Sequence, residues 1–498
     1  MNTTGNTSPQ LPKNKLHMNQ IKRRSFLKTS VVTAASLGLS TRSWAQVLGA
    51  NDDIRIAIVG FNGQGRSHIS ALRELKGVRI VALCDADKNV LAKGAKEFQD
   101  RNETVETYAD IRQLLANKNI DAISTATPNH WHALISIWAC QAGKDVYVEK
   151  PVSHNVWEGR KIVEAARKYN RIVQTGTQSR SSIEGIKAAV EWVRAGNLGK
   201  IKVARGLCYK RRASIGKVDG PQPIPPAVDY ELWCGPAAKL PLTRKQLHYD
   251  WHWVWNTGCG DLGNQGIHEM DVARWFLGVN ELSPRVVAVG GRMGYVDDGE
   301  TPNTLIIYHD YPGAPLVFEV RGLPSQKDSK EMDKYKGASI GIVIECENGH
   351  VTVPDYRSAT AYDKDGKMIK QFKGAESHHA NFLKAVRSRK SSDLNADILE
   401  GHLSSALCHT GNISYRLGKQ LAPEEIRDAI QTDADALDAC MRAYEHLQAN
   451  EVDISVEQAT LGVALKMDPK TERFAGNDQA NQLLTRNYRA PFVVPDKV

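Results

Sequence analysis

No stretch of this 498-residue chain approaches the roughly 18 consecutive apolar residues that a membrane-spanning helix needs. The apolar run from Val31 to Leu39 is only about half that length. A stable membrane anchor is therefore not expected. The sequence also contains no internal repeat and no low-complexity tract.

The chain has little net charge once its first 45 residues are set aside. The formal charge is +9, but residues 1–45 contain seven Lys and Arg and no Asp or Glu, which leaves about +2 for the remainder. This balance gives no reason to expect nucleic acid or a membrane surface as a partner. One short basic run, Lys210-Arg211-Arg212, is interpreted either as a solvated loop or as an anion contact.

Residues 1–45 are typical of an export signal. The twin-arginine sequence Arg23-Arg24-Ser25-Phe26-Leu27-Lys28 precedes the apolar run, and Ser43-Trp44-Ala45 is an A-x-A-like cleavage site. The pattern predicts export by the twin-arginine machinery to the periplasm or outside the cell. That route carries folded proteins.

The eight cysteines form no CxxC pair and show no zinc-ligand spacing. Because a folded exported protein matures in the reducing cytoplasm, we expect mostly free thiols. The histidines of His378-His379 and His402…His409 lie on predicted helices without carboxylates at metal-like spacing. They are interpreted as structural, and no metal is expected.

Strand and helix signals alternate from Ile54 onward. Apolar strands are predicted at 54–59, 78–83, 122–126, 146–148 and 172–175, each separated from the next by a helical stretch. Such alternation requires crossover connections and a parallel sheet covered on both faces. The sequence predicts an α/β protein that begins with a doubly wound Rossmann domain over residues 50–175.

The pattern changes after residue 176, where strands follow one another with turns between them. They are predicted at 203–209, 285–290, 304–308, 316–321, 340–346 and 350–353, with helices at 379–390 and 400–417. Consecutive strands of this kind indicate a large, mostly antiparallel open sheet. We expect an α+β domain over 176–420 and a helical and irregular extension over 421–498.

The first predicted strand is followed by the turn Gly60-Phe61-Asn62-Gly63-Gln64-Gly65, which opens a helix. Glycines there allow a tight turn and close approach of the backbone to a pyrophosphate. Asp85 lies about 20 residues further on, where a carboxylate binds the adenosine ribose and repels a 2′-phosphate, which favours NAD over NADP. Asn62 replaces the second glycine of the usual pattern, and Asn tolerates positive φ. The alternative is a glycine-rich turn with a helix-capping Asp.

Three further motifs follow predicted strands or precede them: Thr127-Pro128-Asn129-His130-Trp131-His132, Glu149-Lys150-Pro151 and Gly199-Lys200-Ile201. Together they resemble the Gfo/Idh/MocA oxidoreductases, which include glucose–fructose oxidoreductase and inositol dehydrogenase. The resemblance covers nearly all of the chain after the export signal. It implies a Rossmann domain followed by an α/β domain whose open sheet carries the substrate and often mediates oligomers, so a homodimer or homotetramer is expected.

The glycine-rich turn and the resemblance together predict the NAD-binding residues. These are Gly60, Asn62, Gly63, Gln64, Gly65, Asp85, Thr127, Pro128, Asn129, His132, Glu149 and Lys150. His130 and His132 each have two interpretations, a contact to cofactor or substrate and a structural hydrogen bond, and the sequence favours neither.

Four residues are predicted to be catalytic. The resemblance implies that Lys150 reaches the reacting hydroxyl, where an ammonium stabilises developing alkoxide charge. His268 suits a general base, and Asp271, three residues later, is expected to orient it or to begin a helix. Asn264 stands where the family has a carboxylate and would share a helical face with His268 and Asp271. Asp261 is the candidate to replace that lost carboxylate.

Trp251, Trp253 and Trp255 alternate along the sequence, so in a strand they would line one face. Indole rings stack on the apolar C–H faces of sugars, which makes a carbohydrate platform one interpretation. Core packing is the other.

These features predict a periplasmic NAD-dependent oxidoreductase that acts on a hydroxyl of a sugar, polyol or glycoside. Because no pool of free dinucleotide exists outside the cytoplasm, we expect the cofactor to travel tightly bound and to be recycled in place. One alternative is an NAD-dependent glycoside hydrolase that works by transient oxidation, elimination, hydration and re-reduction, and therefore needs no external electron acceptor. A second alternative is a sugar- or nucleotide-binding protein without turnover, which the joint presence of Lys150 and His268 argues against.

Overall fold

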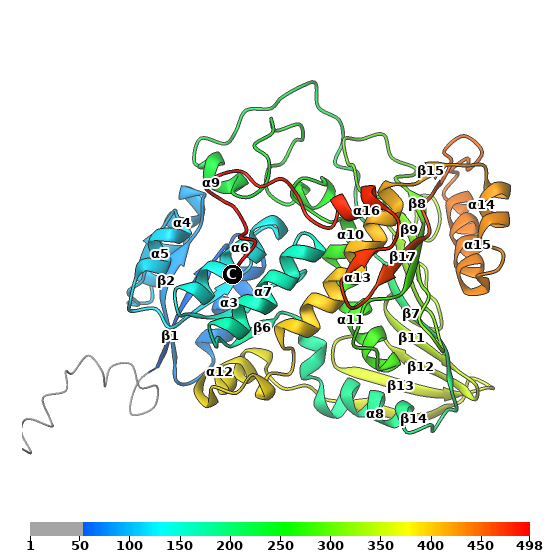
Figure 1. Cartoon of the computed structure of the whole chain (residues 1–498), viewed down its shortest axis with the longest axis horizontal. Helices are drawn as coiled ribbons and strands as arrows, with labels where there is room; N and C mark the ends of the chain where they lie inside the picture. Colours follow the sequence, from blue (N-terminus) through cyan, green and yellow to red (C-terminus); the bar gives the residue numbers. More distant parts are fainter. Residues whose placement is uncertain (1–52) are drawn as a thin grey trace, which may run out of the picture. The chain divides into compact units, whose positions relative to one another are not determined.

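The computed structural model describes residues 53–498, and the predicted export signal at 1–45 lies outside them. Figure 1 shows the order of helices and strands along this part of the chain. Within residues 53–498, no helix combines the length and the apolar character required to cross a membrane.

Six parallel strands form the first sheet, in the order β3-β2-β1-β4-β5-β6. The strands are β1 (Ile54–Val59), β2 (Val78–Cys84), β3 (Glu106–Tyr108), β4 (Ala122–Thr125), β5 (Asp145–Val148) and β6 (Val173–Thr175). Helices follow them in alternation: α3 (Gln64–Arg73), α4 (Lys88–Gln99), α5 (Ile111–Ala116), α6 (Asn129–Gln141) and α7 (Val156–Lys168). The predicted doubly wound Rossmann sheet is confirmed.

The strand order reverses between β1 and β4, which pair in register from Ile56 with Ala122 to Val59 with Thr125. The chain leaves β1 toward β2 and β3, and later returns to β4 on the other side. Such a switch point opens a crevice at the carboxyl ends of the two strands, where ligands of doubly wound sheets bind. The glycine-rich turn after β1 and Thr127 after β4 both lie there.

The second sheet is large and mostly antiparallel, in the order β14-β13-β12-β11-β7-β10-β9-β8-β16-β15. The strands are β7 (Ile201–Tyr209), β8 (Arg285–Gly291), β9 (Thr304–His309), β10 (Leu316–Arg321), β11 (Ile340–Cys346), β12 (Gly349–Val353), β13 (Ser358–Asp363), β14 (Met368–Lys373), β15 (Lys419–Gln420) and β16 (Thr460–Leu461). Only β7 and β10 pair in parallel among these neighbours. The predicted α+β half is confirmed.

Helices cover the inner face of this sheet and separate it from the Rossmann half. They are α8 (Ala188–Arg194), α11 (Gly266–Leu277) and α13 (Ile398–Arg416), and α12 (His378–Ser388) precedes α13. Alternate strand residues such as Leu305 and Ile307 pack in this core, while Ile306 and Tyr308 belong to a cluster on the opposite face. The period-two alternation of β9 therefore buries both faces of the sheet.

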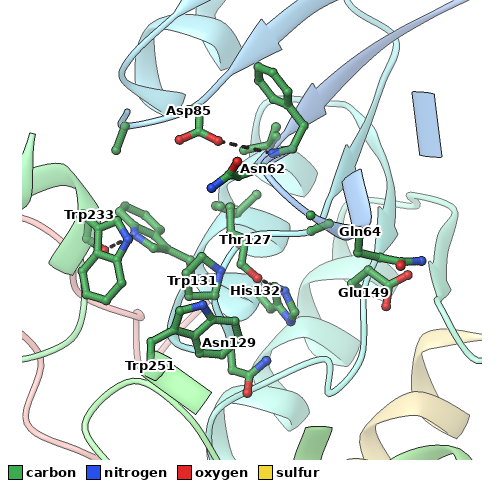
Figure 2. A pocket seen from close by; sticks show the side chains of 18 of the residues that line it. Asn62, Gln64, Asp85, Thr127, Asn129, Trp131, His132, Glu149, Trp233 and Trp251 are labelled. Atoms are coloured by element: carbon green, nitrogen blue, oxygen red, sulfur yellow. Dashed lines mark hydrogen bonds between the residues drawn. The ribbon is translucent and has the colours of Figure 1, made fainter. Parts of the chain in front are cut away.

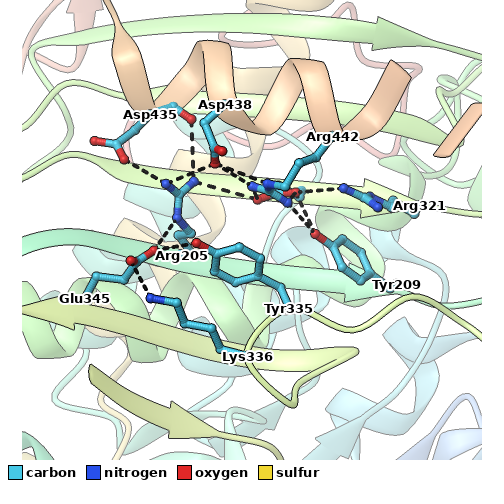
Figure 3. Close-up of polar contacts among 10 residues, drawn as sticks. Arg205, Tyr209, Arg321, Tyr335, Lys336, Glu345, Asp435, Asp438 and Arg442 are labelled. Atoms are coloured by element: carbon cyan, nitrogen blue, oxygen red, sulfur yellow. Dashed lines mark hydrogen bonds and ion pairs between the residues drawn. The ribbon is translucent and has the colours of Figure 1, made fainter. Parts of the chain in front are cut away.

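The opposite face is covered by α15 (Ala434–Ala449), which follows α14 (Pro423–Ile430). Buried charges join α15 to the sheet (Figure 3). Arg205 of β7 is 3% exposed and donates to Asp435 of α15 at 2.7 Å and to Glu345 of β11 at 2.8 Å. Arg442 of α15 donates to both carboxylate oxygens of Glu319 in β10, at 2.7 and 2.9 Å. Each arginine thus exchanges its hydration for fixed carboxylate partners.

Some local features differ from the sequence prediction. The prediction did not include β13 and β14, and α8 is preceded by a π-helical turn over Ile183–Lys187. Residues 460–468, within the expected extension, add β16 and β17 (Leu465–Asp468) to the second sheet beside β8. Short β18 (Arg473–Phe474) and α16 (Asp478–Gln482) follow.

Candidate active site

A cavity of about 430 Å³ opens at the switch point between β1 and β4 (Figure 2). It is lined by the glycine-rich turn, the ends of β2, β4 and β5, and a segment of the second half that includes Trp233 and Trp251. Of the predicted NAD-binding residues, all except Gly65 line it. Lys150 and Asn264 line it as well, whereas His268 and Asp271 do not.

Two glycines of the turn are required by the backbone. Gly60 has φ +73°, and a Cβ there would lie 2.8 Å from Thr127. A Cβ at Gly65 would lie 2.2 Å from the carbonyl oxygen of Gly60, so Gly65 packs inside the turn and does not face the cavity. At Gly63 a Cβ would meet nothing within 4 Å, which leaves open space in front of α3.

The site fits a dinucleotide. No side chain caps the N-terminus of α3, so the first backbone N–H groups of this ten-residue helix remain available to a pyrophosphate. Asp85, at the end of β2, accepts hydrogen bonds from the backbone N–H groups of Phe61 at 3.3 Å and Asp87 at 3.0 Å. Burial raises the pKa of Asp85, which favours a polar partner such as a pair of ribose hydroxyls beside this carboxyl.

Lys150 is held beside a buried carboxylate. Its Nζ donates to the backbone carbonyl of Asn264 at 2.8 Å, and its backbone N–H donates to Glu149 at 3.2 Å. His68 contacts the other oxygen of Glu149 at 3.0 Å. Although burial raises the pKa of Glu149, its hydrogen bond and electrostatic interaction with His68, together with the charge of Lys150, lower it to about 2. Glu149 is thus an anion that stabilises the charged form of Lys150, while burial lowers the pKa of the lysine.

The helical segment that carries Asn264, His268 and Asp271 is interrupted at Gln265. Asn264 ends α10 (Gly260–Asn264), and α11 begins at Gly266, so Asn264 and His268 do not lie on one continuous helix. The interruption exposes the Asn264 carbonyl to Lys150. Asp261 lies 3.4 Å from the Asn264 amide but is bound by Arg212, whose two nitrogens donate to it at 2.7 and 2.6 Å. The basic run is therefore partly an ion-paired element of the site and not a solvated loop.

His268 is 5% exposed and lies beside Lys150, with its ring 4.8 Å from the ring of Tyr356. Its Nδ1 is buried and has no hydrogen-bond partner in the described part of the chain. Burial first, and then the charge of Lys150, lower its pKa to about 3. The ring is neutral at physiological pH and has a free nitrogen to accept a proton.

Asp271 lies fully buried and away from the cavity. Arg180 donates to both of its oxygens at 2.9 Å, and Ser404 donates at 2.7 Å. Burial raises the pKa of Asp271, but the charge of Arg180 outweighs this effect and lowers it. The carboxylate joins α11, α13 and the start of the second half, and every strong contact it makes is with the protein.

His252, which is not among the residues predicted from the sequence, lines the cavity. His252 Nδ1 donates to the backbone carbonyl of Tyr249 at 2.5 Å, so in the neutral ring Nε2 carries the free lone pair. Its ring stacks on Trp251 with centroids 3.6 Å apart. Burial, together with the charges of Lys150 and Arg212, lowers its pKa to about 3. Only the aromatic run in the sequence pointed to this segment.

The three tryptophans do not lie on a strand. Residues Asp250–Trp253 form one turn of 3₁₀-helix, so the three rings diverge. Trp251 lines the cavity, Trp253 is buried under Arg212, and Trp255 lies under Arg416. Of these three indoles, only that of Trp251 lines the cavity.

His130 and His132 make structural hydrogen bonds. Both nitrogens of His132 lie near backbone carbonyls, 2.6 Å from Pro151 and 2.8 Å from Thr127. His130 contacts the carbonyl of Trp233 at 3.0 Å and does not line the cavity. His132 does line it, and fixes the loop that follows β4 against the loop that follows β5.

Within residues 53–498, no group of three or more His, Cys, Asp or Glu side chains is arranged to hold a metal ion. All eight cysteines lie in this range as buried free thiols, as predicted.

A Rossmann crevice with a buried lysine at its mouth defines an NAD-binding oxidoreductase fold, and comparison with known families supports this class. Residues 54–177 match the oxidoreductase family model for the NAD-binding Rossmann fold, and residues 182–447 match the model for its C-terminal alpha/beta domain. The chain belongs to the Gfo/Idh/MocA oxidoreductase family.

The curated relatives and the solved structures have low sequence identity to this chain. A protein of Shewanella sp. (strain ANA-3) named glycosyl hydrolase family 109 protein 2 is 29% identical over 171 residues, which are 30% of this chain and 38% of the relative. The WlbA dehydrogenase from Bordetella pertussis, solved with NADH and UDP-GlcNAcA, is 20% identical with a TM-score of 0.52 over 71% of this chain and 94% of that one. A levoglucosan dehydrogenase solved with NADH and levoglucosan is 17% identical with a TM-score of 0.52, over 72% and 95%. At these identities the two structures show the fold.

Proposed function

We propose that this protein is an NAD-dependent oxidoreductase that acts on a hydroxyl group of a sugar, polyol or glycoside. The observation that carries the proposal is the position of Lys150, which lines the dinucleotide cavity beside two neutral imidazoles, His268 and His252. Relatives of the same fold that were solved with NADH and a sugar or sugar nucleotide support the substrate class.

An NAD held by the turn after β1 and by Asp85 would supply the acceptor for the hydride that leaves the substrate carbon. Lys150 Nζ donates a hydrogen bond to the substrate oxygen and stabilises the negative charge that develops there. An imidazole removes the hydroxyl proton, and His268 and His252 both have the neutral form that this step requires. Glu149 keeps a counter-charge within the site while the lysine acts.

Trp251 gives the site an apolar surface of the kind that sugar C–H faces contact. Its ring is stacked on that of His252, and both residues line the cavity. Because Trp253 and Trp255 do not line the cavity, the polar contacts of Lys150 and the imidazoles become more important for selectivity.

We further propose that the cofactor is resident and that the protein is exported. The twin-arginine sequence at 23–28 supports export to the periplasm or beyond, and a dinucleotide pool is absent there. A tightly bound NAD, returned to its starting state in each cycle by a second sugar or a redox partner, meets that condition. A homo-oligomer stays a prediction.

A second candidate is a glycoside hydrolase that uses NAD without net redox change. The Shewanella relatives named glycosyl hydrolase family 109 favour it, although they match only 30% of this chain. This candidate requires the same Lys150 and imidazole chemistry, followed by removal of a proton from the neighbouring carbon.

One assay separates the candidates. The protein, purified without added nucleotide, is offered nitrophenyl glycosides and, separately, free sugars with an electron acceptor. Release of nitrophenol without acceptor identifies a glycosidase, and acceptor-dependent turnover identifies an oxidoreductase. If a protein that contains NAD shows no cofactor reduction with any member of the panel, a binding protein without turnover is the better description.

A further inference from the structure

Residues 484–498, here called the tail, lie beyond both regions that match the family models. Figure 1 shows the stretch after α16 as a red trace that passes α9 (Tyr230–Cys234) and reaches α6. The Trp157 backbone N–H donates to the Leu484 carbonyl at 3.0 Å. The buried Phe492 ring lies 5.5 Å from the ring of Trp131. The tail is therefore packed on the Rossmann half.

A second segment, residues 227–237, forms one wall of the dinucleotide cavity; we call it the roof. Leu232 and Trp233 of the roof line the cavity. The roof is joined to the Rossmann half immediately after Asp85, where the backbones of 86–88 and 227–229 exchange two hydrogen bonds of 2.9 Å each. These contacts fix one end of the roof to the Rossmann half.

Arg489 of the tail holds the other end of the roof. Its guanidinium donates to the backbone carbonyls of Glu231 and Gly235, each at 2.9 Å, and pairs with the Glu231 carboxylate. The roof contains the five-residue helix α9, where the backbone N–H of the C-cap residue Gly235 donates to the Glu231 carbonyl at 3.1 Å, so that carbonyl accepts from both Gly235 and Arg489. A cation at this end satisfies carbonyls and also matches the negative end of the helix dipole.

Trp131 connects the tail, the roof and the cavity. Its indole N–H donates to the carbonyls of Leu232 and Trp233 at 3.0 and 3.1 Å, and its ring lines the cavity. Gly235 has φ +48°, and a Cβ there would lie 2.2 Å from this ring. The roof thus packs as closely on Trp131 as a residue without a side chain allows, and Phe492 supports the indole on another side.

We propose that Arg489 is a positioning residue that latches the roof over the bound dinucleotide and slows its release. The inference rests on the proposed function only for the identity of the ligand. Each hydrogen bond from Arg489 to the roof adds to the free energy of the local opening through which a ligand leaves. The latch explains how a resident cofactor is retained by residues outside the family match.

The test measures dissociation of NAD and not turnover. Protein loaded with radiolabelled NAD is chased with excess unlabelled NAD, and the loss of label is followed for wild type, Arg489→Ala and Gly235→Ala. Because hydrogen bonds to charged groups are among the stronger ones, we expect release from Arg489→Ala to be about tenfold to a hundredfold faster. Arg427→Ala, an exposed arginine of α14, is the matched control and should release NAD at the wild-type rate.

Wild-type release kinetics in a folded Arg489→Ala protein would overturn the latch. If Arg489→Ala does not fold, Gly235→Ala must show the faster release, because its methyl group separates the roof from Trp131; an unchanged rate there overturns the latch as well. Binding of NAD by wild type with equal release from all variants refutes the latch alone. A wild type that binds no NAD refutes the proposed function, and the latch with it.

Discussion

Lys150 Nζ lies 2.8 Å from the backbone carbonyl oxygen of Asn264, although the two residues are 114 positions apart in the sequence. The contact joins the end of β5 in the Rossmann half to the break between α10 and α11 in the other half. A lysine held in this way has its position set by both halves of the protein, which is how a reacting group is pre-organised.

Replacing Lys150 with Ala is expected to lower kcat by roughly 10²- to 10³-fold, because one donor to a developing alkoxide is lost. Cofactor binding should persist, since the turn after β1 and Asp85 are unaffected. Initial rates with the best substrate of the panel, together with NAD titration, check both points. Lys96→Ala, at a lysine 71% exposed, is the control. Full activity of the Lys150 variant would remove this residue from the reaction.

Asp85→Ala is expected to weaken NAD binding about tenfold or more, because a buried acceptor for the ribose hydroxyls is removed. Binding of NADP should weaken less, since the same carboxylate repels a 2′-phosphate. Calorimetric titration of nucleotide-free protein with each dinucleotide measures the ratio of the two dissociation constants. An unchanged ratio would mean that Asp85 only supports the turn through its bonds to Phe61 and Asp87.

The pH dependence of activity should show no acid limb near pH 6.5. The pKa of His268 is lowered to about 3, so the imidazole stays neutral and able to accept a proton down to about pH 4. Stability, unlike activity, should change below about pH 6.5, because the same histidine binds a proton there in the unfolded chain. The free energy of unfolding should therefore decrease as pH falls below 6.5, by about 1.4 kcal/mol per pH unit for each such histidine.

Two measurements check this pH prediction. The ratio kcat/KM is recorded between pH 5 and 8, and urea denaturation is recorded over the same range. In His268→Asn the decrease in stability toward low pH should be shallower. An acid limb near 6.5, in wild type or in this variant, would contradict the prediction, because the pKa of His252 is also lowered to about 3.

Arg205→Ala should destabilise the protein by about 3–5 kcal/mol, because Asp435 would lose its buried cation and Glu345 would keep only the cation of Lys336. The change lies on the face of the sheet covered by α15, so NAD affinity should be unaffected. Urea denaturation and NAD titration measure the two quantities. Arg427→Ala serves again as an exposed control, with an expected effect within about 0.5 kcal/mol. A similarly small effect at Arg205 would show that its buried ion pairs add no net stability.

Much of the Rossmann half was predictable from the sequence because its signals are local. Apolar runs such as Ile54–Val59 and the glycines at 60 and 65 encode a strand and a tight turn within a few residues. Asp85 was predictable because strand length and helix length set its spacing from the turn. Strands with one polar and one apolar face, such as β13, were missed because short alternating stretches resemble loops.

The sequence by itself determined the fold class, the family and the dinucleotide turn, since each depends on the periodicity or spacing of neighbouring residues. Only the tertiary structure decided which side chains share the cavity. It brought His252 and Trp251 to Lys150, engaged Asp271 with Arg180, and placed Arg489 on the roof, 254 positions from Gly235 in the chain. Those contacts follow from how loops pack between two sheets, and no local pattern encodes a packing that is completed only when distant segments meet.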